Sequence, residues 1–262
     1  MLSRKSKRKL LLVAGLVMLM GLLAGCGVDV NGTKETSDLI NGNFWEKNVV
    51  YYFAVTLDTF AGWFGNSYGL AVLMLTIIVR TAILPLTLKQ YRSSKAMQAI
   101  QPKMQEIQKK YKDNPEKLQM EMMKLYQANG VNPLAGCLPM FVQMPVFIAL
   151  YNAIYWNQDL RLHEFLGLQL GEPSPWYFLP LLAAATSFIQ TKMMQKSQPQ
   201  QQQMAAMSMI MNIFPIMIFV MSLSFPAALP LYWVYSNLYT IVQNYFMYYR
   251  PASRKGKEVA AK

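Results

Sequence analysis

Long apolar runs, separated by short polar segments, dominate this chain of 262 residues. A helix needs about 20 mainly apolar residues to cross a bilayer. On that measure the pattern predicts an all-α membrane protein with five membrane-spanning helices, and Phe225-Pro226 divides the last uncharged run into two antiparallel helices. The predicted spans are residues 67–88, 132–156, 176–195, 204–223 and 227–248.

The first 25 residues are organised like a secretion signal, with basic residues followed by an apolar stretch from Leu10 to Leu23. The stretch ends in Leu23-Ala-Gly-Cys26, which resembles a bacterial lipobox. We therefore expect residues 1–25 to be a signal peptide and Cys26 to be the lipid-modified first residue of the mature protein. The alternative is an uncleaved signal anchor. The second cysteine, Cys137, then has no partner, so no disulfide framework is indicated.

Residues 26–66 are expected to form an extracytoplasmic N-terminal segment. From Val49 to Phe64 the pattern is amphipathic and rich in aromatic residues, which is typical of a helix that lies in the membrane interface. Gly65-Asn66 should end this interfacial amphipathic helix before the first span begins.

The net charge of +12 is distributed unevenly between the predicted loops. Segment 89–131 carries nine basic and four acidic residues, whereas segment 157–175 carries three acidic residues against one arginine. Loops that face the cytoplasm are enriched in Lys and Arg. This rule places segment 89–131, loop 196–203 and tail 249–262 in the cytoplasm. Loop 157–175 and the mature, lipid-anchored N-terminus then lie outside the bacterial cytoplasmic membrane, and the basicity needs no nucleic-acid partner.

Segment 89–131 is expected to form a cytoplasmic helical hairpin. Lys89–Lys112 is rich in Gln, Lys, Met and Ala, which favour helix formation. Asn114-Pro115 interrupts this pattern, and Glu116–Asn129 predicts a second helix that Gly130 closes.

Arg80 is the only charged residue between Asp58 and Lys89, in the middle of the first predicted span. A charge at that depth costs roughly 2.5–3.5 kcal/mol on insertion scales. The other predicted spans contain no Asp or Glu, so water, backbone carbonyls or an acid from another molecule must solvate Arg80. Two alternatives are snorkelling towards Lys89, about 13 Å further along the helix, and an ion pair with Asp58.

Polar residues recur in the other spans as well. In the last span, Trp233, Asn237, Thr240 and Asn244 share one helical face by their spacing. Each residue by itself is explained by hydrogen bonding between helices, at about 0.6 kcal/mol. Together with an unpaired arginine, the set predicts a hydrophilic groove within the bundle. The candidate groove residues are Arg80, Thr76, Gln143, Ser187, Gln190, Trp233, Asn237 and Asn244.

Residue types that carry most enzyme chemistry are scarce in this chain. One histidine and two cysteines do not make a common zinc site. The predicted spans hold no carboxylate and the chain has no phosphate-binding glycine loop. We therefore expect no enzymatic activity, no metal and no cofactor. One function class that the composition leaves open is an anion or solute transporter that uses Arg80 as its binding site, although the internal repeats common in transporters are not seen.

Several ordered motifs resemble the YidC/Oxa/Alb family of membrane protein insertases, and in particular its Gram-positive lipoprotein type. They are Cys26 in its lipobox, Ile78-Val-Arg80 with Leu84-Pro85-Leu86, Gln90-Tyr-Arg-Ser-Ser-Lys-Ala-Met97, Gly130-Val-Asn-Pro-Leu-Ala-Gly-Cys-Leu-Pro139 and Phe225-Pro-Ala-Ala-Leu-Pro-Leu-Tyr-Trp-Val234. Because the resemblance is to the short lipoprotein type, we do not expect the large extracytoplasmic domain of Gram-negative members or the long basic C-terminal extension of mitochondrial members.

The resemblance implies an insertase with a hydrophilic groove that is open to the cytoplasm and to lipid and closed to the outside, with Arg80 in the groove. It implies nascent membrane proteins as substrates, with the Sec translocon, the ribosome and membrane lipids as further partners. Four lysines of the cytoplasmic segment are expected to receive the emerging protein without nucleotide consumption. They are Lys95, Lys103, Lys109 and Lys110.

Overall fold

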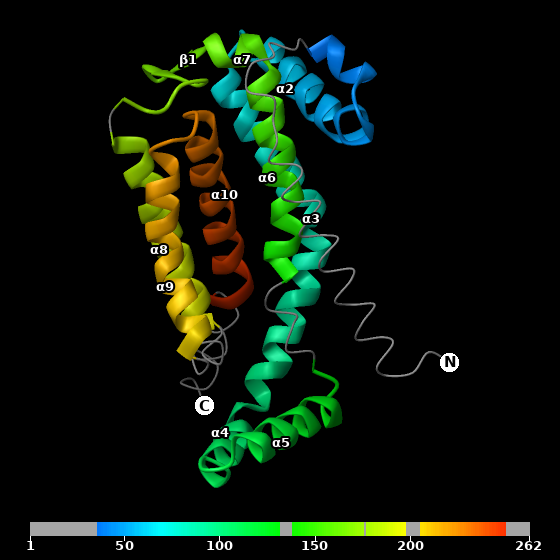
Figure 1. Ribbon diagram of the computed structural model, residues 1–262, viewed down its shortest axis with the longest axis vertical. Coiled ribbons are helices and arrows are strands. Elements are labelled where there is room, and N and C mark those ends of the chain that lie inside the picture. Colours follow the sequence, from blue (N-terminus) through cyan, green and yellow to red (C-terminus); the bar gives the residue numbers. More distant parts are fainter. Residues whose placement is uncertain (1–35, 132–137, 176, 198–204, 250–262) are drawn as a thin grey trace, which may run out of the picture.

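The computed structural model describes residues 36–131, 138–175, 177–197 and 205–249. Almost all of this part is helical, as expected for an all-α protein (Figure 1). Residues 1–35, which include Cys26 and the predicted signal peptide, lie outside the described residues, as do Cys137 and the basic tail from residue 250.

The elements follow one another in a simple order along the chain. They are η1 (Thr36–Asn41), η2 (Glu46–Val50), α2 (Tyr51–Trp63), α3 (Tyr68–Ala99), α4 (Gln101–Lys110), α5 (Pro115–Ala128), α6 (Leu138–Trp156), α7 (Gln158–Leu162), β1 (Glu164–Phe165), β2 (Leu168–Gln169), α8 (Phe178–Ser197), α9 (Ala205–Ser222), α10 (Ala228–Asn244) and η5 (Tyr245–Tyr249).

Helices α3, α6, α8, α9 and α10 coincide with the five apolar segments predicted from the sequence. Within the described residues, α3 is the one helix that is both long and apolar enough to cross a membrane by length and composition alone. Its start is set by Gly65 and Asn66, which have positive φ angles of 62° and 65° and so end α2, as predicted. The other helices are shorter, so the number of membrane crossings is treated below as a proposal.

Helix α3 does not end where the apolar run ends. It continues to Ala99 despite Pro85 in its interior, and the helix ends only at Ile100. The prediction of one unbroken helix from Lys89 to Lys112 is therefore wrong, because Ile100 divides that segment between α3 and α4. Composition favours helix in most of this segment, but Pro102 lies in the first turn of α4, where its missing N–H is tolerated, so a proline causes the break locally. Ile100 is buried in the small core of the hairpin.

Helix α10 is central to the bundle, where it contacts α3, α6 and α8, while α9 packs on the far side of α8 (Figure 1). Helix α2 lies against α3 and α6 with one face buried, including Leu57, and it exposes Tyr52 and Trp63. This agrees with the predicted amphipathic helix. The hydrophobic core joins all of these helices through side chains such as Leu150 and Leu229, both fully buried.

One end of the bundle, here called the loop end, carries α7 and the two short strands (Figure 1). Leu166 and Gly167 form the tight turn between the strands, both with positive φ, and the sequence did not predict this hairpin. The loop that follows is held to the start of α10, because Ala227 N donates to Glu172 O at 2.8 Å and Ala228 N donates to Leu170 O at 3.0 Å.

The opposite end, here called the hairpin end, carries α4 and α5 (Figure 1). The Asn114 side chain caps α5 by accepting from Lys117 N at 3.0 Å. Gly130, with φ 61°, ends α5, and Val131 N donates to Tyr126 O at 3.0 Å, a Schellman arrangement. The small core around buried Met104 holds the two helices together, so α4 and α5 form a helical hairpin that begins at Gln101.

Candidate functional site in the helix bundle

Arg80 is half-buried on the α10 side of α3, about 18 Å from the start of that helix at ~1.5 Å per residue. Its Nε donates to Ser236 Oγ at 3.0 Å, and Nη2 donates to the same oxygen. Ser236 lies on α10 and is 2% exposed. The guanidinium therefore has a neutral hydrogen-bond partner, and the described residues provide it with no carboxylate.

Asp58, the acid considered as a partner of Arg80, is engaged elsewhere. It accepts hydrogen bonds from Tyr68 Oη at 2.9 Å, from Asn157 Nδ2 at 2.5 Å and from Thr36 Oγ1 at 3.3 Å. These contacts join α2 to the start of α3 and to the beginning of α7 at the loop end. The Arg80–Asp58 alternative is excluded for the described structure, and Asp58 has a structural role.

The α3–α10 interface contains a second polar contact close to Arg80. Thr81 Oγ1 and Tyr239 Oη lie 3.2 Å apart, and Thr81 also donates to the Ile77 carbonyl of its own helix. Thr76, predicted to line a groove, is 1% exposed, and its hydroxyl donates to Val72 O at 2.6 Å. The single hydroxyl proton of Thr76 is therefore donated within α3 and is not offered to a groove.

Two other predicted groove residues bridge helices through α10. Asn237 Nδ2 donates to Ser187 Oγ at 2.8 Å and to Thr186 Oγ1 at 3.1 Å, which ties α10 to α8. Gln143 Nε2 of α6 donates to Tyr232 Oη of α10 at 2.5 Å. Polar side chains of α3, α6 and α8 thus each form a hydrogen bond with a side chain of α10.

Trp233 belongs to an aromatic cluster between α6 and α10. Its ring stacks on Phe147, with centroids 5.2 Å apart and planes at 18°, and Phe225 lies 6.2 Å from both rings. Tyr151 extends the cluster with a centroid 6.0 Å from Phe225. Trp233 therefore contributes packing, and offset aromatic pairs of this kind stabilise by about 0.5–1.5 kcal/mol beyond the area that they bury.

Gln190 and Asn244 are half-buried on α8 and at the end of α10, and neither side chain makes a hydrogen bond within the described part of the chain. Sequence reasoning missed Ser236, the residue that holds Arg80, although Ser236 lies one turn before Thr240 on α10. It also missed a polar contact between α8 and α9, where Gln195 Nε2 donates to Asn212 Oδ1 at 3.1 Å.

Three of the four predicted capture lysines lie on α4, namely Lys103, Lys109 and Lys110, and all three are exposed. Lys95 is exposed too, but it lies on the extension of α3, with its Nζ 4.6 Å from the centre of the Tyr91 ring. The hairpin also carries a local ion pair, because Lys124 Nζ lies 2.6 Å from Glu121 Oε1 and lowers the pKa of Glu121 by donating this hydrogen bond.

The described residues contain no group of three or more His, Cys, Asp or Glu side chains placed to hold a metal ion. The fold and the site define a helical bundle with one long apolar helix and an arginine within the bundle, whose hydrogen-bond partner among the described residues is the neutral Ser236 hydroxyl. A half-buried guanidinium of this kind can attract an anion without the displacement of an internal acid.

Comparison with known proteins agrees with this class. The chain belongs to the 60Kd inner membrane protein family, whose model matches residues 59–254. It is similar to membrane protein insertase YidC 2 of Bacillus anthracis, with 45% identity over 97% of this chain and 96% of that protein. It is also similar to membrane protein insertase MisCA of Bacillus subtilis, with 44% identity over 92% of each chain.

A solved structure described as an active YidC insertase with the first transmembrane domain resolved has the same fold. The TM-score is 0.61 at 25% sequence identity, over 79% of this chain. This chain spans about half the length of that protein, since 47% of it is covered.

Proposed function

We propose that this protein is a membrane protein insertase that uses Arg80 to attract the acidic, hydrophilic tails of its substrates. The observation that carries the proposal is the contact of the Arg80 guanidinium with the neutral Ser236 hydroxyl, while Asp58 is bound elsewhere. Family membership and the similarity to proteins named as insertases support the same activity.

In the membrane arrangement that we propose, α3, α6, α8, α9 and α10 are five crossings around a hydrophilic groove. The hairpin end then faces the cytoplasm, because it carries the basic segment, and the loop end faces outward. The lipid-modified Cys26 anchors the mature N-terminus outside, and the basic tail lies inside. The tight attachment of the loop after β2 to α10 supports an outer side that is closed.

The groove would be lined by the polar side chains that the sequence singled out. They are Arg80, Thr76, Gln143, Ser187, Gln190, Trp233, Asn237 and Asn244. Arg80 is half-buried and bonded only to the neutral Ser236, and the half-buried Gln190 and Asn244 side chains make no hydrogen bond within the described residues, so these three are well placed to meet a substrate. Asn237 and Trp233 shape the groove through α8 and α6.

The attraction between Arg80 and an acidic tail is a large enough free energy to affect insertion. Two opposite unit charges 4 Å apart interact by about 4 kcal/mol at an effective dielectric constant near 20, before desolvation costs. An acidic tail that moves outward also gains about 2.3 kcal/mol per charge per 100 mV. The apolar part of the substrate is then driven into lipid by roughly 25 cal/mol for each Å² that leaves water. No nucleotide is required in this sequence of steps.

The hairpin would receive the substrate before the groove does. Lys103, Lys109 and Lys110 on α4, with Lys95 just before it, are exposed cations that can attract an acidic nascent segment. Nascent membrane proteins are therefore the proposed partners, with the ribosome and the Sec translocon as further partners on the cytoplasmic side.

The test is insertion of a small single-spanning substrate with an acidic N-terminal tail into liposomes that contain the purified protein. Arg80→Ala should slow insertion by more than about tenfold, because over 1.4 kcal/mol of attraction is lost. Arg80→Lys should keep much of the rate. Arg92→Ala, which removes an exposed arginine further along α3, is the matched control and should leave the rate unchanged. Unaltered insertion by Arg80→Ala would contradict electrostatic capture.

A second measurement separates insertion from transport. Liposomes with the protein and no protein substrate should show no flux of small anions above empty liposomes. Anion flux that disappears in Arg80→Ala would instead support the transporter alternative.

A further inference from the structure

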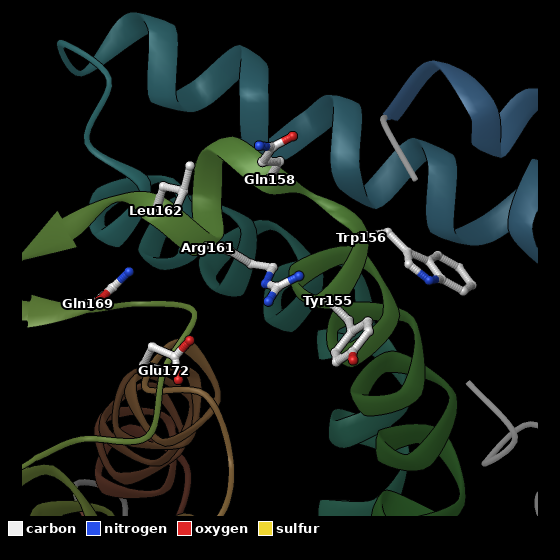
Figure 2. Close-up of a pocket in the computed structure, with 7 residues that line it drawn as sticks. All are labelled: Tyr155, Trp156, Gln158, Arg161, Leu162, Gln169 and Glu172. Carbon is white, nitrogen blue, oxygen red and sulfur yellow. The ribbon is translucent and has the colours of Figure 1, made fainter. Parts of the chain in front are cut away.

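A pocket of about 180 Å³ lies at the loop end, between the end of α6, α7 and the loop that follows β2 (Figure 2). Tyr155, Arg161 and Leu162 line one side, and Gln169 and Glu172 line the other. Neither side contributes to the proposed groove, so the pocket is a separate feature of the molecule.

Backbone contacts fix the two sides of the pocket relative to each other. Gly171 N donates to Arg161 O at 3.1 Å, and a Cβ atom at Gly171 would come within 2.5 Å of that carbonyl oxygen. The carbonyl of Glu172 accepts from Ala227 N at 2.8 Å. The positions of Arg161 and Glu172 are therefore set by hydrogen-bonded backbone, as in a preformed binding site.

The pocket presents one positive and one negative side chain. The Arg161 guanidinium carbon lies 5.4 Å from the centre of the Tyr155 ring, a cation–π arrangement that holds the side chain over the aromatic wall (Figure 2). Glu172 is exposed on the opposite side. Neither charge forms an ion pair with a described residue, so both remain available to a ligand that carries both signs.

The surroundings of the pocket indicate where such a ligand comes from. Large apolar side chains at the loop end are strongly exposed, including Leu162 at 64%, which lines the pocket itself, and Leu166 at 82%. Trp63 at the end of α2, and Tyr177 and Phe178 at the start of α8, are exposed as well. Exposed aromatic and apolar residues at one level of a membrane protein are typical of the membrane–water interface, where lipid headgroups lie.

We infer that the pocket binds the headgroup of a zwitterionic aminophospholipid, with its phosphate at Arg161, its ammonium group at Glu172 and its chains against Leu162 and Tyr155. The inference rests on the membrane placement in the proposed function and does not depend on Arg80. Free phosphoethanolamine shares this headgroup chemistry, whereas phosphatidylglycerol lacks the ammonium group.

The experiment is native mass spectrometry of the purified protein titrated with phosphatidylethanolamine, phosphatidylglycerol or free phosphoethanolamine. Phosphatidylethanolamine should bind most tightly. Arg161→Gln and Glu172→Gln should each weaken its binding about two- to fivefold, the range for one exposed charge contact. Arg161→Lys should retain part of the affinity. Lys47→Gln and Glu164→Gln remove exposed charges near the same end outside the pocket and are the matched controls.

Equal binding of phosphatidylglycerol and phosphatidylethanolamine would overturn the inference, and so would unchanged affinity in folded Arg161→Gln and Glu172→Gln. If free phosphoethanolamine binds as tightly as the lipid, the occupant is a soluble phosphoamine and the lipid assignment is wrong. Arg80→Ala should bind phosphatidylethanolamine normally. A negative insertion test would therefore leave the lipid-binding result unaffected, and a negative lipid-binding test would leave the insertion result unaffected.

Discussion

Arg80 on α3 and Ser236 on α10 are joined by two hydrogen bonds to one oxygen, from Nε at 3.0 Å and from Nη2. A guanidinium has five N–H donors, so about three of them remain beyond this contact. The relationship orients the side chain without neutralising its charge, which is the property that an anion-capturing arginine requires.

Ser236→Ala should slow insertion of an acid-tailed substrate by about two- to tenfold, which is less than Arg80→Ala does. The charge stays, but the hydroxyl that orients the guanidinium is lost, and hydrogen bonds to charged groups are among the stronger ones. Insertion kinetics in liposomes measure the effect. Thr81→Val removes a neighbouring hydroxyl of the α3–α10 interface without touching Arg80 and should have little effect; equal losses in both variants would argue against an orienting role for Ser236.

Asn237 and Ser187 should be energetically coupled across the α8–α10 interface, because the amide donates to the hydroxyl at 2.8 Å. A double-mutant cycle with Asn237→Ala and Ser187→Ala should give a coupling free energy of about 0.6 kcal/mol and no more than about 1.7 kcal/mol, as for other hydrogen bonds between membrane helices. Reversible unfolding in detergent provides the four free energies. Strictly additive losses would show that the bond contributes nothing.

Gly69→Ala should destabilise the protein by about 1–3 kcal/mol, the usual cost of overpacking. A Cβ atom at Gly69 would come within 2.2 Å of Cγ of the Phe165 ring, which packs on α3 from the strand hairpin. The midpoint of thermal unfolding measures the loss, and Phe165→Leu in the same chain should restore part of it.

Gly62→Ala is the matched control for that substitution. Gly62 lies in α2 with nothing within 4 Å of the Cβ position, and alanine favours helix over glycine by roughly 1 kcal/mol. Its unfolding midpoint should stay the same or rise. A similar loss in both variants would exclude the contact with Phe165 as the cause.

Asn114→Ala should loosen the hairpin end, because the Asn114 side chain caps α5 by accepting from Lys117 N. Loss of such a cap costs about 1 kcal/mol. Faster amide hydrogen exchange in α5, with unchanged exchange in α8 and α10, is the expected result. Asn114→Asp should preserve protection, since aspartate caps helices equally well; protection that survives in Asn114→Ala would show that the cap is dispensable.

The sequence by itself determined the helical segments of this protein. A span of about 20 apolar residues requires a helix whatever its neighbours are, because the backbone must satisfy its own hydrogen bonds in lipid. Local residue chemistry also determined the breaks at Gly65-Asn66 and Gly130, where positive φ angles favour glycine and asparagine. The importance of Arg80 followed from the cost of a charge among apolar residues, which needs no tertiary information.

Only the tertiary structure decided which polar groups meet. The choice of Ser236 over Asp58 as the partner of Arg80 depends on which face of α10 packs on α3, and helix periodicity alone does not fix that rotation. The Phe165 ring of the strand hairpin packs against Gly69 of α3, a contact between residues far apart in the sequence. The physical reason is that apolar length and turn chemistry act within a few residues, whereas hydrogen-bond partners and packing are set by the whole bundle.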